Sequence, residues 1–159
     1  MTGVQTCALP ISDNIGGAAK AVEHLIRLGR KQIVFFGDPS LPEIGLRYEG
    51  YLAALENASR PLEARYIVPA HLTSETAFAA MSELLRSDVP FDAVFAASDL
   101  IAISAIQAIT AAGKSVPHDV AVAGFDDIAL AAHSNPALTT VRQDLEIGAR
   151  AIEIGRAHV

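Results

Sequence analysis

The sequence predicts an α/β fold in which an open, mostly parallel β-sheet is covered by helices on both faces. Helix-like and strand-like patterns alternate four times along the chain, as expected of consecutive βαβ units. The strand-like runs at Ile33–Phe36 and 94–97 are apolar throughout, which is typical of strands buried on both faces. Right-handed crossovers then place helices on both sides of the sheet. The length of 159 residues fits one domain.

The first half of the chain contains two helical patterns and two strand-like runs. Asp13 or Asn14 can cap the first helix with a side-chain oxygen, and Gly29 can end it. The second helix carries apolar residues on one face, and both strand-like runs are short and β-rich. The elements expected here are a helix from residue 13 or 14 to 29, a strand over 32–36, a helix over 45–58 and a strand over 66–69.

The second half repeats this alternation. Thr73 or Ser74 can cap one helix, and Asp99 is expected mainly as the cap of the next, which Gly113 ends. That next helix is apolar nearly all round, which places it in the core or in a subunit interface. The elements expected are a helix from 73 or 74 to 85, a strand over 93–97, a helix over 100–112, a strand over 120–125, a less regular segment over 136–141 and a helix from about 144.

Composition and charge argue against several classes of protein. The formal net charge is −6, whereas a nucleic-acid-binding surface is typically rich in Lys and Arg. No uninterrupted apolar run approaches the roughly 18 residues that a membrane span needs, and residues 1–12 lack the basic start of a signal peptide. The single Cys7 excludes an internal disulfide. We therefore expect a cytoplasmic protein without membrane contact.

Both ends of the chain resemble translated sequencing-adapter DNA. Residues 1–12 are MTGVQTCALPIS, and residues 153–159 are EIGRAHV. We expect these two segments to be non-native tails, with native sequence over residues 13–152. Under this interpretation Cys7 and His158 have no functional meaning.

Polar and ionisable residues gather where the predicted strands end. In open parallel sheets ligands bind beyond the carboxyl ends of the strands, and three of the four strand ends here carry a carboxylate. Carboxylates accept paired hydrogen bonds and a guanidinium donates them in a fixed fork, so together they suit a polyhydroxylated ligand. The residues are Gly37, Asp38, Glu43 and Arg47 after the first strand, His71 and Leu72 after the second, Ser98 and Asp99 after the third, and Asp126 and Asp127 after the fourth.

Several of these residues also have a purely structural interpretation. Asp38 precedes a proline and is typical of a turn. Arg47 is also compatible with a plain surface charge on its helix, and Asp126 and Asp127 with a loop or a cap. Position alone leaves these alternatives open.

No arrangement in the sequence indicates catalysis or a bound cofactor. Ser98 has no His near it in the sequence and no G-x-S-x-G elbow, and no Cys/His spacing resembles a zinc site. The glycines at 16–17 match neither GxxxxGK[ST] nor GxGxxG. Asp99 together with 126–127 offers carboxylates for Mg²⁺, but no phosphate-binding loop accompanies them. We expect a binding protein rather than an enzyme, with no cofactor and no metal.

Five segments of the chain form a recognisable combination. They are DNIGG at 13–17, RYEGY at 47–51, VFAASD at 94–99, VPHDVAVAGFDD at 116–127 and PALTTVRQ at 136–143. In this combination the chain resembles the lactose-repressor (LacI/GalR) family of bacterial transcription regulators. The combination is specific although each segment alone is weak, and the resemblance covers residues 13–152.

The resemblance implies a two-lobed sensing core of the periplasmic-binding-protein-like type I, preceded by a helix-turn-helix domain. Residues 13–143 are then expected to be the C-terminal lobe of the effector-binding core, and residues 144–152 the start of a helix returning to an N-terminal lobe that this chain lacks. Family effectors are mostly sugars and sometimes nucleobases or other metabolites. The expected partners are a small-molecule effector, which we take to be a sugar, a second copy bound through this lobe, and DNA only through the missing N-terminal domain.

The resemblance also implies roles for single residues. Arg47 matches the family's effector-binding arginine, and Asp126 matches the aspartate that takes ligand hydroxyl or amino groups. Leu72 stands where many members place an aromatic ring, and Glu43 where Ser or Thr is common, so the chain departs from the family pattern there. The expected ligand-binding residues are Arg47, Asp126, Ser98, Gln143 at the lobe crossing, Leu72 and Glu43.

Two other functions compete with this interpretation. A sugar-binding protein of an ABC-type transporter has the same fold, but the LTTVxQ pattern at 138–143 favours the regulator. A doubly wound enzyme would need a nucleophile, a metal set or a cofactor loop that the sequence does not offer. We therefore expect the effector-sensing part of a DNA-binding transcription regulator.

Overall fold

The computed structural model describes residues 13–143. The expected tails at 1–12 and 153–159 and the helix expected from 144 lie outside the described residues. The strands are β1 (Ile33–Phe36), β2 (Ile67–Val68), β3 (Ala93–Ala96), β4 (Ala121–Asp126) and β5 (Thr139–Arg142). The helices are α1 (Asn14–Arg27), α2 (Pro42–Asn57), α3 (Ser74–Arg86), α4 (Asp99–Ala111) and α5 (Ala129–His133), with one 3-10 turn, η1 (Ala64–Tyr66).

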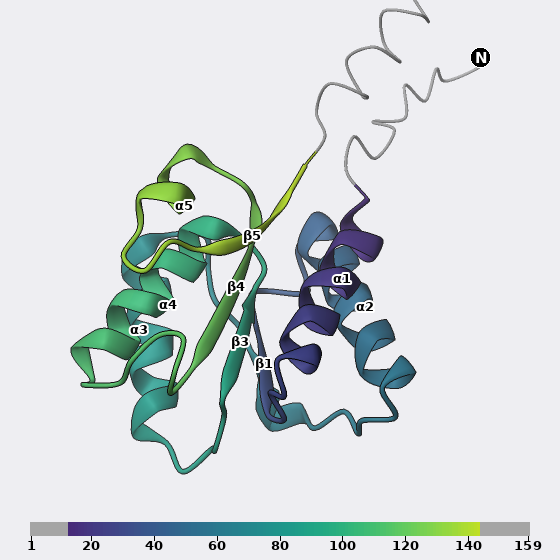
Figure 1. The fold of residues 1–159 in the computed structure, drawn as a ribbon, viewed down its shortest axis with the longest axis horizontal. Coiled ribbons are helices and arrows are strands. Elements are labelled where there is room, and N and C mark those ends of the chain that lie inside the picture. The colour runs from purple at the N-terminus through teal and green to yellow at the C-terminus, as the bar shows by residue number, and fades with distance from the viewer. Residues whose placement is uncertain (1–12, 144–159) are drawn as a thin grey trace, which may run out of the picture.

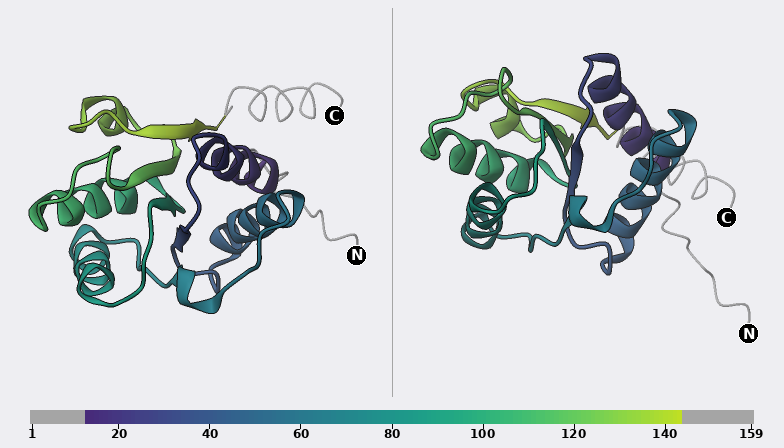
Figure 2. Two further views of the ribbon diagram at one scale, coloured as in Figure 1. Left: turned by 60° about the horizontal axis from the view of Figure 1, so that its bottom comes forward. Right: turned by 90° about the horizontal axis from the view of Figure 1, so that it is seen from below.

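The strands form one parallel sheet in the order β2-β1-β3-β4-β5. Helices α1 and α2 cover one face of this sheet, and α3 and α4 cover the other (Figures 1 and 2). The predicted class, an open parallel sheet between two layers of helices, is therefore confirmed. The register pairs Asp126, the last residue of β4, with Arg142, the last residue of β5, so the ends of these two strands meet at one edge.

The sequence offered two alternative capping residues for each of the helices α1 and α3, and the structure shows which one is used. The Asp13 side chain caps α1 by accepting a hydrogen bond from the Gly16 backbone N–H at 2.8 Å. The Thr73 hydroxyl caps α3 by accepting from the Thr76 N–H at 3.3 Å. These bonds satisfy donors that a helix leaves free in its first turn, and they leave Asn14 available for another role.

One predicted boundary and two predicted segments need correction. Helix α2 begins at Pro42 rather than near residue 45, because the fixed φ of proline suits the first turn of a helix. The segment expected to be irregular contains β5, whose residues are exposed or half-buried and so lack the apolar run of an interior strand. The short helix α5 was not predicted.

The sequence placed the apolar helix α4 either in the core or in a subunit interface. It packs against β3, β4 and α3, and side chains such as Ile101, Ala105 and Ile109 are fully buried. The helix is thus mainly part of the core, although Leu100 in its first turn is 38% exposed. Among residues 13–143, no helix combines the length and apolar character that crossing a membrane requires.

Helices α1 and α2 touch through Gly50, which gives a first testable prediction. A Cβ at this position would lie 2.3 Å from the Ile15 carbonyl oxygen and 2.7 Å from the Ala18 Cβ. Gly50→Ala must push the two helices apart, and we expect it to lower the free energy of unfolding by about 1–3 kcal/mol in urea denaturation. Glu49→Ala, at an exposed position of the same helix, should change it by less than about 0.5 kcal/mol. Equal stability of G50A and the wild type would contradict the close approach.

Candidate functional site

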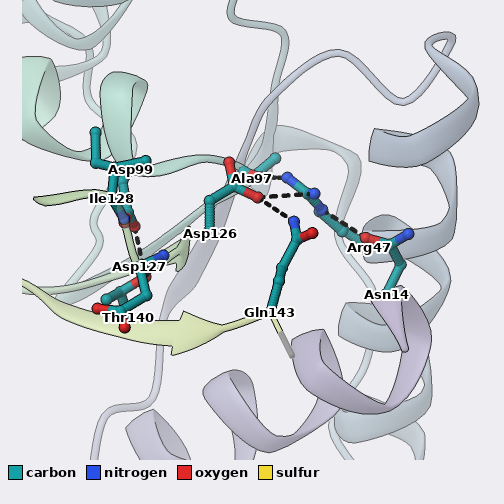
Figure 3. A network of polar contacts seen from close by, with 9 residues as sticks. All are labelled: Asn14, Arg47, Ala97, Asp99, Asp126, Asp127, Ile128, Thr140 and Gln143. Atoms are coloured by element: carbon teal, nitrogen blue, oxygen red, sulfur yellow. Dashed lines mark hydrogen bonds and ion pairs between the residues drawn. The ribbon is translucent and has the colours of Figure 1, made fainter. Parts of the chain in front are cut away.

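Polar groups from five separate segments meet at the carboxyl edge of the sheet (Figure 3). Asn14 begins α1, Arg47 lies in α2, Ala97 follows β3, Asp126 ends β4 and Gln143 follows β5. They come together because the strands are parallel and all end on one side. This is the edge at which open α/β sheets bind ligands.

Arg47 is the centre of this cluster, and the protein holds its guanidinium on every side. Helix α2 buries a stripe that includes Ile44, Arg47 and Tyr51, so the arginine is only 4% exposed. Its Nε donates to the Asn14 Oδ1 at 2.9 Å and its Nη1 to the Ala97 carbonyl at 2.5 Å. The guanidinium carbon also lies 4.0 Å from the centre of the Phe125 ring. Arg47 is therefore a fixed feature of the site and not the surface charge that the sequence left open.

Asp126 provides the counter-charge from the end of β4. Its Oδ1 lies 3.0 Å from the Arg47 Nη2, and its side chain is 28% exposed. Burial raises the pKa of this carboxyl, and the charge of Arg47 opposes that rise. The backbone here is strained, with φ +114° at Asp126 and +55° at Asp127, a conformation that costs on the order of 1–3 kcal/mol for a residue other than glycine. Such strain is typical of functional sites.

Gln143 and Ser98 complete the cluster in different ways. The Gln143 side-chain amide donates to the same Oδ1 of Asp126, and no described residue donates to the other carboxylate oxygen, Oδ2. Ser98 is 8% exposed, and its hydroxyl has no hydrogen-bond partner among residues 13–143. A buried polar group without a partner is uncommon and needs an explanation. Both free groups are suited to a bound polar molecule.

Asp99 does not cap α4, and that prediction was wrong. Ser98 is the N-cap residue, and Asp99 is the first residue of the helix. Its fully buried carboxylate accepts hydrogen bonds from the Ile128 N–H at 2.9 Å and from the Thr140 hydroxyl at 2.5 Å. Asp99 therefore joins the start of α4 to β5 and to the turn that follows β4.

Glu43 and Leu72 lie outside the hydrogen-bonded cluster. Glu43 is exposed in the first turn of α2, and its negative charge contributes to raising the pKa of Asp126. Leu72 is 46% exposed, between β2 and α3, and has no part in the polar network. The structure thus brings Arg47, Asp126 and Gln143 into direct contact and leaves these two at the periphery.

Sequence reasoning missed two residues that organise the site. Asn14 is 7% exposed and fixes the Arg47 guanidinium, and Thr140 connects Asp99 to the Asp127 N–H. The sequence did hold one signal for Asn14. Only one residue of the Asp13–Asn14 pair can cap the helix, so the other is available for a different contact. Nothing in the local sequence marks Thr140.

The three carboxylates considered for Mg²⁺ are engaged with protein groups instead. Asp99 binds Ile128 and Thr140, Asp126 pairs with Arg47, and Asp127 pairs with Arg142 at 2.7 Å. Within the described part of the chain, no group of three His, Cys, Asp or Glu residues is placed to hold a metal ion.

Comparison with known proteins identifies the type of domain. Residues 22–157 match the family described as periplasmic binding protein-like domain. The chain belongs to this family. It is 39% identical over 139 residues to the HTH-type transcriptional regulator CelR of Thermobifida fusca, covering 87% of this chain and 41% of CelR.

Solved structures of this periplasmic binding protein-like type agree. The structure is similar to the CelR–cellobiose complex, with a TM-score of 0.81 and 38% identity over 86% of this chain and 42% of that one. It is similar to a regulatory protein of the LacI family from Chloroflexus aggregans, with a TM-score of 0.83 and 32% identity over 89% of this chain and 52% of that one. The resemblance to LacI/GalR regulators is confirmed, and the chain corresponds to part of their effector-binding domain. It spans less than half the length of CelR.

Proposed function

We propose that this chain is the sensing lobe of a DNA-binding transcription regulator and that its carboxyl edge forms one wall of a cleft for a polyhydroxylated effector. The observation that supports this most directly is the ion pair between buried Arg47 and half-buried Asp126. Among residues 13–143, neither the Asp126 Oδ2 nor the nearby Ser98 hydroxyl has a hydrogen-bond partner. The Asp126 side chain is 28% exposed, whereas the Ser98 hydroxyl lies buried just behind it.

Each residue of the site has a distinct role in this proposal. The Asp126 Oδ2 accepts a hydrogen bond from a ligand hydroxyl, and Ser98 donates or accepts one beside it. Arg47 keeps Asp126 ionised and oriented, and Gln143 lies on the segment that leads out of the lobe. A hydrogen bond to a charged group contributes roughly 1.5–3 kcal/mol, so a few such bonds support micromolar binding.

A sugar is the effector class that we favour. The cellobiose in the CelR complex supports this choice, since the CelR structure is similar to 86% of the present chain. Nothing in the site requires turnover of the ligand, so we propose binding without catalysis. Closure of two lobes around the effector would then change DNA binding by a domain elsewhere in the regulator, with a coupling of about 1–3 kcal/mol.

We also propose that this lobe pairs with a second copy of itself in the cytoplasm, where a bacterial regulator meets DNA. Four large apolar side chains are between 36% and 52% exposed on or beside α3, α4 and α5: Phe78, Leu100, Ile128 and Leu130. Contiguous exposed apolar patches mark protein–protein contacts, and we propose that these four side chains form such a patch.

Titration of the chain with neutral saccharides tests the site. We expect cellobiose or another member of a panel of neutral mono- and disaccharides to shift NMR signals of Ser98, Asp126 and Gln143. Asp126→Asn should weaken that binding about 10–100-fold, because a charged acceptor is lost. Asp88→Asn is the matched control, since Asp88 is exposed and lies in the loop before β3, at the opposite edge of the sheet from the site. Unchanged affinity in D126N, or no binding by the wild type across the panel, would contradict the proposal.

The competing function is a transporter's sugar-binding protein, which shares the fold. The regulator names of the similar proteins favour sensing over transport. The gene sequence upstream of the region that encodes this lobe distinguishes the two functions, because a regulator encodes a helix-turn-helix there and an exported binding protein encodes a signal peptide.

A further inference from the structure

A second cavity lies at the amino edge of the sheet, opposite the edge that carries Arg47 and Asp126. Its volume is about 350 Å³, which is within the range of small-molecule sites. The chain turns back after α2 at Ser59, where φ is +53°, and residues 60–66 return alongside the start of β1. The walls of the cavity are therefore the last turns of α2, the first residues of β1 and this returning segment.

The base of the cavity is apolar. Ile33, Tyr51 and Leu55 line it, and each is no more than 7% exposed. The Tyr51 hydroxyl donates to the Ile33 carbonyl at 2.9 Å, so the wall from α2 is joined directly to β1. A compact apolar group of a ligand can pack against these side chains.

Two cationic side chains, Arg60 and Lys31, line the same cavity. The Arg60 Nη1 donates to the Arg30 carbonyl at 2.5 Å and to the Lys31 carbonyl at 3.4 Å, which anchors the guanidinium beside the start of β1. Its Nε and Nη2 have no acceptor among residues 13–143, and no carboxylate of that range forms an ion pair with Arg60 or Lys31. A guanidinium anchored in this way has donors left for a carboxylate or phosphate group.

The returning segment adds a carboxylate and a buried hydroxyl to the lining. The carboxylate, Glu63, is paired with Arg65 at 2.7 Å, and the Arg65 guanidinium carbon lies 5.1 Å from the centre of the Tyr66 ring. Tyr66 is 6% exposed, and its hydroxyl has no hydrogen-bond partner among residues 13–143, which is uncommon for a buried polar group. The cavity thus combines an apolar base, an excess of positive charge and a hydroxyl that lacks a partner.

We propose that this cavity is a second ligand site, for a small molecule that carries a carboxylate or phosphate group on a compact apolar body such as an aromatic ring. Arg60 and Lys31 bind the anionic group, and the buried side chains of α2 and β1 contact the apolar body. Tyr66, whose side chain also lines the cavity, offers its hydroxyl as a further donor. The proposal does not rest on the sugar site, because the two sites lie at opposite edges of the sheet and share no residue.

Four small probes titrated into the chain by NMR test the chemistry of the site. Benzoate and phenyl phosphate carry the two anionic groups, benzyl alcohol has the ring without a charge, and inorganic phosphate has the charge without a ring. We expect both aromatic anions to shift signals of residues 31–33 and 60–66. At least one of them should bind about tenfold more tightly than benzyl alcohol in dilute buffer, with a smaller gap at high ionic strength, where charges are screened. Phenyl phosphate should also bind about tenfold more tightly than inorganic phosphate, because it buries a ring.

Substitutions assign the binding to single residues. Arg60→Gln should weaken binding of the aromatic anions about tenfold, since a charged donor is lost. Because Arg60 also holds backbone carbonyls, Lys31→Gln, which changes an exposed side chain, gives a second test with an expected loss of about threefold. Lys114→Gln is the control, since Lys114 is exposed, follows α4 and does not line the cavity.

Tyr66→Phe distinguishes a ligand-binding hydroxyl from a structural one. The hydroxyl has no partner in the free protein, so its removal should not lower stability in urea denaturation, whereas binding of the aromatic anions should weaken about 3–10-fold. Unchanged affinity in Y66F would overturn the role of this hydroxyl, and unchanged affinity in both R60Q and K31Q would overturn the assignment of the cations. If neither aromatic anion shifts signals of this cavity, or if benzyl alcohol or inorganic phosphate binds as tightly as they do, the second site is overturned. Saccharide binding at the carboxyl edge is measured separately and is unaffected by any of these results.

Discussion

Replacing Arg47 by alanine is expected to lower the free energy of unfolding by about 3–5 kcal/mol, because it leaves a partly buried carboxylate without its counter-charge. The change also removes the hydrogen bonds to Asn14 and to the Ala97 carbonyl and the contact with the Phe125 ring. Urea denaturation measures the loss. Arg86→Ala, an exposed arginine in the last turn of α3, is the control and should cost at most about 1 kcal/mol.

The pH dependence of this loss identifies its cause. Burial already raises the pKa of Asp126, and Arg47 opposes the rise, so R47A should raise that pKa further. A carboxyl with a raised pKa in the folded state destabilises the protein fully above that pKa, and the penalty is relieved as the pH falls through it. The difference in stability between R47A and the wild type should therefore shrink between neutral pH and about pH 4. A difference independent of pH would show that packing, not charge, accounts for the loss.

Arg47→Lys separates charge from geometry at the same position. Lysine keeps the positive charge, but its single ammonium cannot reproduce three contacts in different directions. We expect a loss of stability between those of the wild type and R47A, with little change in its pH dependence. Both variants should lose saccharide binding, because Asp126 is no longer held in place.

The sequence predicted which charged residues lie at the carboxyl edge of the sheet better than it predicted the hydrogen bonds that join them. Arg47 and Asp126 could be found because a parallel sheet brings its strand ends together and because both residues match positions in the LacI/GalR pattern. Asp99 was misassigned because a cap and the first helical residue differ by one position, and both Ser98 and Asp99 are good caps. Only the three-dimensional contacts decide between them.

Strand β5 shows a second limit of sequence reasoning. Its residues, Thr139–Arg142, lie at the edge of the sheet and are exposed or half-buried, so they lack the continuous apolar run that marked the interior strands. Their pairing with β4 is fixed by tertiary contacts such as the Thr140–Asp99 hydrogen bond. The same contacts place Gln143 beside Asp126, which no local pattern specifies.

Asp99→Ala is expected to have the second largest effect, because one buried carboxylate joins three elements. It accepts hydrogen bonds from the Ile128 N–H and from the Thr140 hydroxyl, which in turn accepts from the Asp127 N–H at 3.3 Å. Gly124 lies against it, since a Cβ there would come within 2.3 Å of the carboxylate. Alanine leaves the Ile128 N–H without its partner and creates a void beneath the site.

We expect D99A to lower the free energy of unfolding by about 2–4 kcal/mol, since each hydrogen bond to a charged group contributes roughly 1.5–3 kcal/mol and relief of burying the charge offsets part of the loss. Burial raises the pKa of Asp99, so the wild type is penalised above that pKa and relieved as the pH falls through it. Asp99→Asn keeps the shape and does not titrate. The stability of the wild type relative to D99N should therefore increase as the pH falls from 7 to about 4.

Saccharide affinity shows whether Asp99 also positions the binding groups. Because Asp99 connects α4, the Asp127 turn and β5, its loss should loosen Asp126 and Gln143 together and weaken binding in D99A, even under conditions in which the variant is fully folded. D99N retains an oxygen that can still accept from Ile128 and should recover part of the affinity. Equal, undiminished affinity in both variants would mean that Asp99 only stabilises the fold and that the binding edge is held by Arg47 alone.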